Sequence, residues 1–456
     1  MPANPSKPTV AIVGGGLAGL SAGCALADNG YQVRLFERRP YLGGRASSYQ
    51  HPATGEVVDN CQHVLLGCCT NLIDLYRRTG VEDKVRWFDR LHFLEPGGRD
   101  SVIELTELPA PLHTAPSFLT SHALSLRDKI GVAQAMLKLR KPIADDGRSF
   151  LDWLRSNKQT ERSIQRFWAP VLVSALNEDL DRCSTFYASQ VFRESFLKSA
   201  QAGRMGIPAI PLSELYSAAG EYIRQRGGEV NLRSSVESVK VNECTATLCM
   251  SGQEISVDSA LLAAPFNGIS NLLPEDDLGT ALRQQISRFE SSPITGIHLW
   301  FDRKITELEH AVLLDRTIQW VFHKSKLLNR EGEGSYVELV VSSSKSLVEM
   351  GRQEIIDLAV RELGEFFPIV RQARLEKATV IKEVHATYSP KPGVDEYRPK
   401  ARTAWPRLFL AGDWTDTGWP ATMEGAVRSG YLAAEAIAGA EFLVPDLPAT
   451  GLMRFL

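Results

Sequence analysis

The sequence lacks the cysteine patterns that stabilise secreted domains or bind zinc. Its 456 residues contain seven cysteines, an odd number, with no CxxC pair and with Cys68 next to Cys69. Such spacing is a poor framework for disulfides and a poor zinc site. We therefore predict reduced thiols, no bound metal and a cytoplasmic location.

An excess of charge of either sign is also missing. Fifty-one Lys and Arg residues nearly balance 54 Asp and Glu residues, which leaves a formal net charge of −3, and 44% of the residues are hydrophobic. This composition is typical of a soluble globular protein, and nothing in it points to nucleic acid. A chain of this length has room for two or three domains.

Long hydrophobic runs are rare as well, and the one exception is interrupted by glycines. The run Val10–Ala27 contains Gly14-x-Gly16-x-x-Gly19 between the strand-like TVAIV and a helical pattern. Gly14 permits a sharp turn, Gly16 lets the backbone approach a pyrophosphate, and Gly19 lets the helix approach the sheet. A second strand-like run ends in Glu37, whose carboxylate suits ribose hydroxyls. We therefore predict a dinucleotide site rather than a membrane segment or signal peptide.

The residues after Glu37 favour a flavin over NAD(P). Arg38 could contact a 2′-phosphate, but Glu37 would repel one. The run Leu42-Gly43-Gly44-Arg45 resembles the extended motif of the flavin amine oxidase and phytoene desaturase superfamily. The resemblance implies non-covalent FAD, with Gly43 and Gly44 close to the cofactor and Arg45 as a cation near its phosphates.

A late segment resembles the other half of the same flavin site. The strand LFLAGD ends in Gly412-Asp413, and a helix with Thr422 as its expected N-cap begins at Met423. In the superfamily the aspartate meets the ribityl and pyrophosphate region, and the helix N-terminus points at the flavin ring, where it stabilises negative charge. The cofactor-binding residues that the resemblance implies are Gly14, Gly16, Gly19, Glu37, Arg38, Gly43, Gly44, Arg45, Val236, Gly412, Asp413, Met423, Glu424 and Ala426.

The order of the patterns predicts a discontinuous α/β architecture. We expect a Rossmann-type FAD-binding domain of the flavin amine oxidase superfamily, built from residues 1–84, 207–289 and 400–456. Helical periodicity predicts a substrate cap over residues 85–206. Alternating strands and one helix predict a substrate-domain sheet over residues 290–399.

A third segment makes the resemblance more specific. Asp59-Asn60-Cys61-Gln62-His63 before Val-Leu-Leu-Gly is similar to the squalene-associated FAD-dependent desaturases, understood as hydroxysqualene dehydroxylases. The family run has glycine where this chain has Cys61, and Val384-His385 stand where a basic pair is expected. The resemblance implies reductive dehydroxylation of hydroxysqualene to squalene by hydride from reduced flavin.

That chemistry needs a proton donor beside a dry, apolar cavity. We expect His63 to be the donor, although it could instead bond to backbone and shape the loop. Gln62 would orient His63 or the flavin, Asp59 would order the turn, and Asn177 and Glu178 are outside candidates. Six helical aromatic residues are candidate cavity walls, namely Phe167, Trp168, Phe186, Tyr187, Phe192 and Phe196.

Three other functions share the fold and stay open. An oxidative carotenoid desaturase would use the same flavin motifs with hydride moving the other way. A flavin amine oxidase would favour a more polar cavity and often a linking cysteine, which the segment 405–430 does not contain. A prenyl-binding escort protein would have a degraded cofactor site. The electron donor could be NAD(P)H or a redox protein, and the basic amphipathic stretch Leu126–Lys141 could hold the protein peripherally on the cytoplasmic membrane face.

Overall fold

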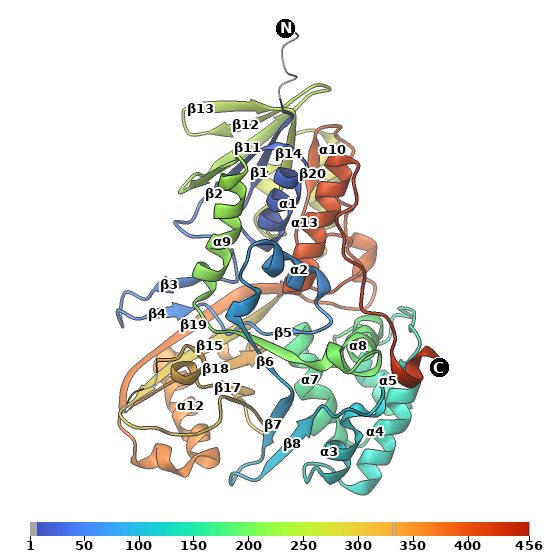
Figure 1. Ribbon diagram of the computed structural model, residues 1–456, viewed down its shortest axis with the longest axis vertical. Coiled ribbons are helices and arrows are strands. Elements are labelled where there is room, and N and C mark those ends of the chain that lie inside the picture. Colours follow the sequence, from blue (N-terminus) through green and yellow to red (C-terminus); the bar gives the residue numbers. More distant parts are fainter. Residues whose placement is uncertain (1–6, 331, 333, 456) are drawn as a thin grey trace.

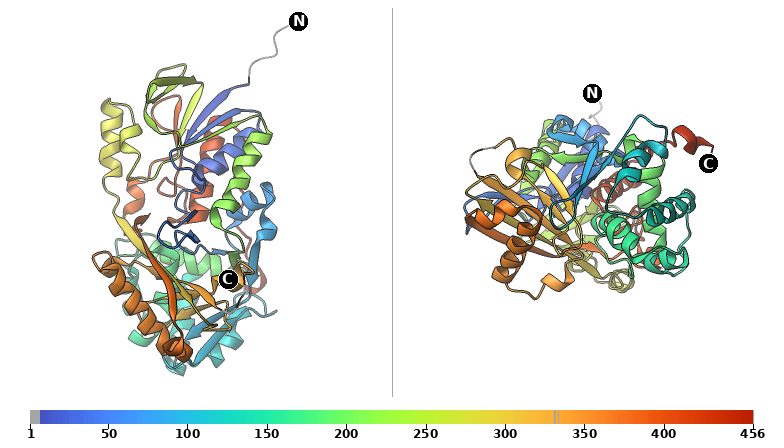
Figure 2. Two further views of the ribbon diagram at one scale, coloured as in Figure 1. Left: turned by 90° about the vertical axis from the view of Figure 1, so that its left-hand side faces the viewer. Right: turned by 90° about the horizontal axis from the view of Figure 1, so that it is seen from below.

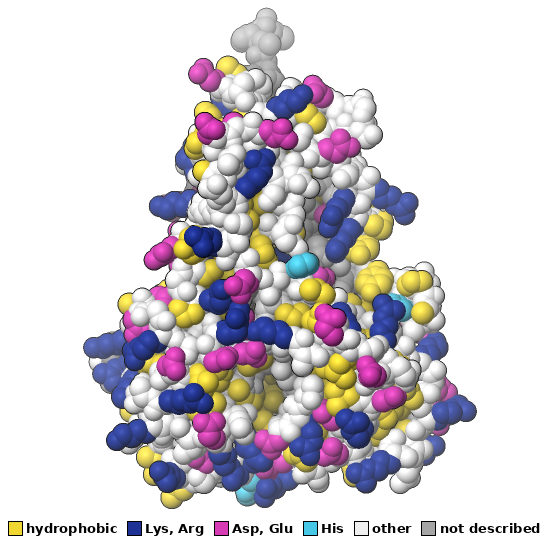
Figure 3. All heavy atoms as spheres, turned by 180° about the vertical axis from the view of Figure 1, so that it is seen from behind, with side chains coloured by type: hydrophobic (Ala, Val, Ile, Leu, Met, Phe, Trp, Pro, Cys, Tyr) yellow, Lys and Arg dark blue, Asp and Glu magenta, His cyan; other side chains and the backbone are white. Residues whose placement is uncertain are grey.

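The computed structural model describes residues 7–330, 332 and 334–455. Its upper part is a five-stranded parallel sheet and its lower part combines a seven-stranded sheet with a group of helices (Figure 1). None of the helices in these residues is long and apolar enough to cross a membrane. Charged side chains of both signs are interspersed over the back face, as the balanced composition predicts (Figure 3).

The parallel sheet has the order β10-β2-β1-β14-β20, so its strands come from both ends and the middle of the chain. Their bounds are Glu229–Leu232, Gln32–Glu37, Thr9–Val13, Ser259–Leu262 and Leu408–Leu410. Alternating side chains of β1 face opposite layers: Val10 and Ile12 pack among the helices, and Ala11 and Val13 pack against a small antiparallel sheet. Both faces are thus buried, as parallel sheets require.

The helical layer on this sheet consists of α1 (Leu17–Asp28), α9 (Leu212–Gln225) and α13 (Met423–Ala438), with α2 (Thr70–Arg78) beside α13. Helix α13 approaches α1 closely at Gly430, where a Cβ would lie 2.1 Å from the Ser21 hydroxyl. The opposite layer is the sheet β11-β12-β13 (Val236–Val241, Ala246–Met250, Gln253–Val257). Helix α10 spans Asp277–Ile286.

The lower sheet has the order β19-β15-β18-β17-β16-β7-β8. The strands are Leu375–Tyr388, Ser291–Phe301, Ser335–Ser342, Trp320–Phe322, His310–Leu313, Arg90–Leu94 and Asp100–Glu104. One face packs on α12 (Arg352–Phe366) through residues such as Ile297, Leu339 and Leu363. Seen from below, the helical group stands on the other side of the sheet from α12 (Figure 2).

The helical group covers the second face of this sheet. It contains α3 (Ala115–Thr120), α4 (Leu126–Leu139), α5 (Phe150–Ser156), α6 (Glu161–Ser163), α7 (Ala169–Leu176) and α8 (Thr185–Phe192), with π-helical turns at Ile164–Trp168 and Arg193–Leu197. The expectation of a helical segment over residues 85–206 needs two corrections, because β7 and β8 form a hairpin that extends the sheet and the two ends of the range, Val85–Phe88 and Met205–Pro208, are paired strands.

Short elements join the two halves of the molecule. They are β3 (Ser48–Gln50), β4 (Val57–Asp59), β5 (Leu65–Leu66), β6 (Val85–Phe88), β9 (Met205–Pro208) and α11 (Lys324–Leu327). The loop between β4 and β5 carries the Asp59–His63 segment, and the carbonyl of Asn60 lies over Gly296 of β15, where a Cβ would be only 3.2 Å away. This contact places the Asp59–His63 segment between the five-stranded parallel sheet and the seven-stranded sheet.

Candidate functional site

One cavity of about 850 Å³ extends from the Gly14 turn of the parallel sheet to the helix-facing side of the lower sheet. Residues from both ends of the chain line its upper part. Thirteen of the fourteen expected cofactor residues lie on its wall, namely Gly14, Gly16, Glu37, Arg38, Gly43, Gly44, Arg45, Val236, Gly412, Asp413, Met423, Glu424 and Ala426. Gly19 lies behind the wall, where a Cβ would be 2.0 Å from the Gly14 carbonyl oxygen.

The glycines leave room that side chains would fill. Gly14 has φ of +116°, and a Cβ there would lie 2.6 Å from the carbonyl oxygen of Ala263. A Cβ at Gly16 would meet nothing nearer than Gly44 Cα at 3.8 Å, so a side chain would project into the cavity. The turn is therefore shaped for close approach of a phosphate-containing group to its backbone.

Charged side chains hold together the early and late chain segments that form the upper part of the cavity, here called the cradle. Glu37 accepts hydrogen bonds from the backbone N–H groups of Gly15 at 2.6 Å and Arg39 at 2.7 Å, so it orders the turn that it borders. Arg45 donates to Asp413 Oδ1 at 2.6 Å and to the Ala386 carbonyl at 2.7 Å. This ion pair joins the early and late cofactor segments directly.

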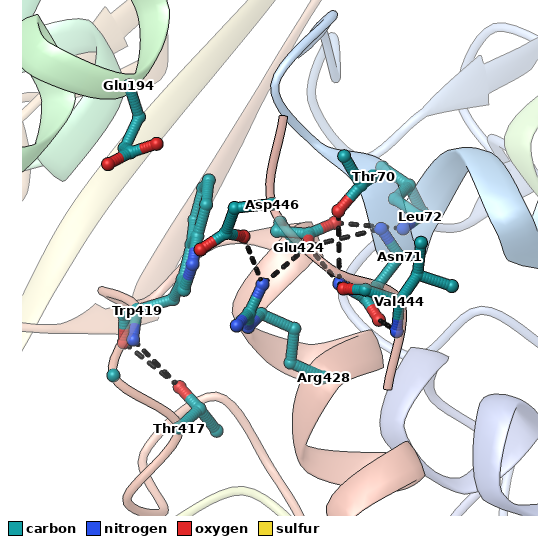
Figure 4. A network of polar contacts seen from close by, with 12 residues as sticks. Thr70, Asn71, Leu72, Glu194, Thr417, Trp419, Glu424, Arg428, Val444 and Asp446 are labelled. Carbon is teal, nitrogen blue, oxygen red and sulfur yellow. Dashed lines mark hydrogen bonds and ion pairs between the residues drawn. The ribbon is translucent and has the colours of Figure 1, made fainter. Parts of the chain in front are cut away.

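The start of α13 is built as an N-terminal binding position, with one difference from expectation. The Thr422 hydroxyl accepts from Gly425 N at 3.0 Å, which confirms the predicted N-cap. Glu424 borders the cavity, but its carboxylate accepts hydrogen bonds from Asn71 and Leu72 of α2 and pairs with Arg428 (Figure 4). Its main contacts therefore hold two helix N-termini together, and burial raises the pKa of its carboxyl.

The C-terminal segment completes this polar network. Arg428 pairs with Asp446 at 2.7 Å, and Asn71 exchanges hydrogen bonds with the backbone of Val444 (Figure 4). Farther along, Thr450 N donates to the Lys198 carbonyl beside the helical group. The segment after α13 thus ties the cofactor-binding half to the helices that cover the lower sheet, as its course in Figure 1 shows.

Comparison with known proteins agrees with this geometry. Residues 17–438 match the family described as flavin containing amine oxidoreductase. The chain belongs to this family. It is 29% identical to a 15-cis-phytoene desaturase of Synechococcus elongatus over 94% of this chain and 95% of that protein. It is 27% identical to a zeta-carotene desaturase of Synechocystis sp. over 94% and 96%. A cyclohexylamine oxidase from Brevibacterium oxydans has the same fold, with a TM-score of 0.70 at 17% identity over 95% and 99%.

Membership of the flavin containing amine oxidoreductase family makes the chain an FAD-dependent oxidoreductase. The residues present fit the cofactor, because the cradle combines a backbone turn open to phosphate, a buried acid at the end of β2 and the N-terminus of α13. FAD bound by these residues would supply a two-electron hydride acceptor or donor.

Asp59 and Gln62 share one buried partner that the sequence did not reveal. Lys324 Nζ donates to Asp59 Oδ2 and to Gln62 Oε1, both at 2.7 Å, and lies 3.5 Å from Glu338. Burial acts to raise the pKa of the Asp59 carboxyl, but the Lys324 ammonium and hydrogen bonds from Ser48 and Leu212 hold it below its usual value. No motif surrounds Lys324, so only the folded chain identifies it.

His63 lies on the cavity wall with its two ring nitrogens in different environments. Nδ1 is 2.8 Å from the carbonyl oxygen of Cys61, which can only accept, so Nδ1 carries the proton. Nε2 makes no hydrogen bond to any residue that the structure describes. Burial lowers the pKa of the imidazole from 6.5. Near neutral pH the ring is therefore uncharged, and Nε2 is a proton acceptor.

The lower part of the cavity is mainly apolar, although Gln190, Glu194, Ser195 and Ser342 also line it, and its walls differ from the expected aromatic set. Phe196 lies on the wall, whereas Phe167, Trp168 and Phe192 pack in the helical core around Phe150, and Phe186 and Tyr187 pack against each other in the same core. The lining role predicted for these five is corrected: their rings pack against one another, away from the cavity. The observed wall residues include Leu66, Leu91, Phe93, Val171, Met205, Ile294, Val312, Trp320, Phe322 and Val340.

Asn177 and Glu178, the two weaker candidates for the proton donor, lie in different places relative to the cavity. Asn177 lies on the cavity wall, but its amide already donates to the Ser292 carbonyl and the Thr387 hydroxyl and accepts from Ser343 N. Glu178 lies behind the wall and pairs with Lys345. Neither arrangement leaves a proton donor directed at the cavity.

Proposed function

We propose that the chain transfers hydride between FAD and a carbon of a long isoprenoid chain bound in the cavity, in the direction of desaturation. The observation that carries the proposal is one continuous space that begins at the flavin cradle and ends among aliphatic and aromatic side chains of the lower sheet and of α7. A space of this kind suits a substrate that gains its binding energy from buried hydrocarbon.

The protonation state of His63 supports the oxidative direction. Desaturation breaks two C–H bonds and forms one C=C bond, so one hydride goes to FAD and one proton needs an acceptor. Neutral His63 has its free Nε2 at the cavity wall and can take that proton. The named relatives, phytoene and zeta-carotene desaturases, support the same direction.

Reductive dehydroxylation of hydroxysqualene is the second candidate. Its support is the Asp59–His63 segment followed by Val-Leu-Leu-Gly, which resembles the squalene-associated enzymes. That reaction needs a proton for the departing hydroxyl, so His63 would have to enter it as the charged imidazolium. The two candidates therefore require opposite protonation states of one side chain.

A pair of anaerobic incubations tests the proposal. Oxidised enzyme is mixed with phytoene, and photoreduced enzyme is mixed with hydroxysqualene, while flavin absorbance and the lipid products are followed. Flavin bleaching with a new double bond supports desaturation. Flavin reoxidation with squalene formation supports the second candidate and overturns the first. No flavin change with either lipid overturns both.

We further propose that an apolar patch on α3, α4 and the nearby C-terminal residues rests on an anionic bilayer. The patch consists of exposed Leu108, Leu112, Leu119, Leu126, Ile130, Leu137, Leu452 and Phe455, with Arg127, Lys138, Arg140, Lys141 and Arg454 around it. The link between α3 and α4 lies behind the cavity wall, because Ala123 packs with Val312 and Phe93, which line the cavity. Attachment through this patch would bring the cavity close to the membrane that holds a lipid substrate.

Vesicle flotation with phosphatidylglycerol tests the patch. Ile130→Glu should reduce bound protein several-fold, because a charge would enter the apolar interface. Leu278→Glu on α10 is the matched control, since Leu278 is 47% exposed and Ile130 is 53% exposed. Equal flotation of the two variants would exclude this surface.

A further inference from the structure

The lower wall of the cavity is a row of side chains that crosses the seven-stranded sheet. The register places Gly296 opposite Val340, Val340 opposite Trp320, Trp320 opposite Val312, and Val312 beside Phe93. Neighbouring strands are about 4.8 Å apart, so four steps from β15 to β7 span roughly 19 Å. The Asp59–His63 loop, on the cofactor side of the cavity, lies over Gly296. Phe93 is therefore the residue of the row farthest from the cofactor site.

Helix α7 forms the opposite wall. Pro170, Val171, Ser174 and Ala175 border the cavity, and their spacing places them on one face of the helix. The space between α7 and the sheet is therefore a channel that runs along the row of wall residues. A linear chain entering from the flavin side would meet Val340 first, then Trp320, then Val312.

Trp320 crosses this channel. Its indole Nε1 donates to the Ser174 hydroxyl at 2.7 Å, so the side chain reaches from β17 to α7. The ring is stacked on Phe322 with centroids 5.4 Å apart and an interplanar angle of 8°, which limits its rotation. Ser174 is held in turn by a hydrogen bond to the Pro170 carbonyl. The indole is therefore fixed from two sides, between the flavin-side part of the cavity and the wall residues Val312 and Phe93, with which it packs.

We infer that Trp320, held by Ser174, determines how much of an isoprenoid chain the cavity accepts. This inference rests on the proposed function and adds a specificity-determining residue to it. The hydrogen bond leaves the indole N–H paired and presents the apolar ring face to the channel. A chain that stops before the ring keeps its full contact with Val340 and Ile294, whereas a longer chain has to displace the ring and break the bond to Ser174.

Binding of saturated hydrocarbons to the FAD-loaded enzyme tests this inference without turnover. Phytane, squalane and perhydrolycopene, with 20, 30 and 40 carbons, are titrated while the flavin absorbance change is measured. Each methylene that becomes buried contributes about fourfold in affinity. Trp320→Ala should therefore shift the preference between the longest and shortest hydrocarbon by at least tenfold toward the longest. Ser174→Ala should shift it in the same direction by a smaller factor.

Two further variants keep the test decisive. Trp300→Ala on β15 is the control, because Trp300 is also half-buried and stacked on a ring, Tyr336, but lies off the cavity wall. Trp320→Phe keeps a ring and removes the bond to Ser174, and it serves if the alanine variant does not fold. The same length preference in wild type, Trp320 variants and control would overturn the role of Trp320. No spectral change with any hydrocarbon in wild type would instead count against the proposed function.

Discussion

Replacing Lys324 by methionine should strongly destabilise the protein, because it removes the cation from a buried ion pair. Lys324 Nζ lies 2.7 Å from Asp59 Oδ2, and the two side chains are only 2% and 5% exposed. Burial raises the pKa of Glu338 to about 8, so at pH 7 Asp59 is the main charged partner. Breaking a buried pair on one side costs about 3–5 kcal/mol, since the remaining charge stays out of water.

Urea unfolding of the FAD-loaded enzyme measures this cost, and a double-mutant cycle assigns it. Lys324→Met is compared with Asp59→Asn and with the double variant, in which neither charge remains. The double variant should recover much of the loss, because apolar or neutral replacement of a buried pair is often tolerated. Lys326→Met is the matched control: Lys326 pairs with exposed Glu307 at 2.7 Å, and surface pairs contribute at most about 1 kcal/mol.

The sign of the pH dependence follows from the direction of the Asp59 shift. Its folded-state pKa lies below 3.8, so the pair contributes its full stability above that value and loses it as the pH falls through the folded-state pKa. In Lys324→Met the unpaired carboxyl can protonate, so the deficit against wild type should shrink in acid. A deficit below about 1 kcal/mol at pH 7, or a double variant as unstable as the sum of the single variants, would refute the buried-pair argument.

Three further predictions concern the cofactor half and the proton acceptor. The rate of substrate-dependent flavin reduction should be constant above pH 6.5 and fall in more acidic solution, because the folded-state pKa of His63 is lowered. In stopped-flow measurements His63→Asn should abolish this pH dependence and lower the rate by a factor of about 10²–10⁴. Arg45→Leu should weaken FAD binding by at least tenfold in fluorescence titrations, since it removes the ion pair to Asp413, and unchanged affinity would exclude this role. Gly430→Val should lower the free energy of unfolding by about 1–3 kcal/mol in thermal melts, because its Cβ would lie 2.2 Å from the Ala18 carbonyl oxygen.

The cofactor half could be predicted from the sequence because each part has a local chemical reason. Gly14 needs a positive φ, Gly16 needs an open approach, and a helix N-terminus needs a cap such as Thr422. These requirements act within a few residues, so spacing alone expresses them. The hairpin β7–β8 was also accessible in principle, because Gly97 and Gly98 lie between two short alternating runs.

The structure of the lower half could not be predicted in the same way, because it depends on contacts between residues that are far apart in the sequence. Helical periodicity shows that Trp168 and Phe192 have an apolar environment, but it does not distinguish a packed core from a cavity wall. Lys324 lies 265 residues from Asp59 in the chain, and no local pattern marks a lysine that will be buried. The channel row from Val340 to Phe93 exists only in the register of the sheet.

The role proposed for His63 depends on where its proton resides, and the loop geometry sets that position before any substrate binds. The Cys61 carbonyl fixes the proton of His63 on Nδ1, and burial near the cations of Lys324 and Arg45 opposes a second proton on Nε2. A group built in this way accepts a proton from a C–H bond more readily than it gives one to a departing hydroxyl. Desaturation should therefore become slower as the pH falls, whereas a reaction that used His63 as an acid should become faster, so the slope of the pH profile discriminates between the two candidates for this cavity.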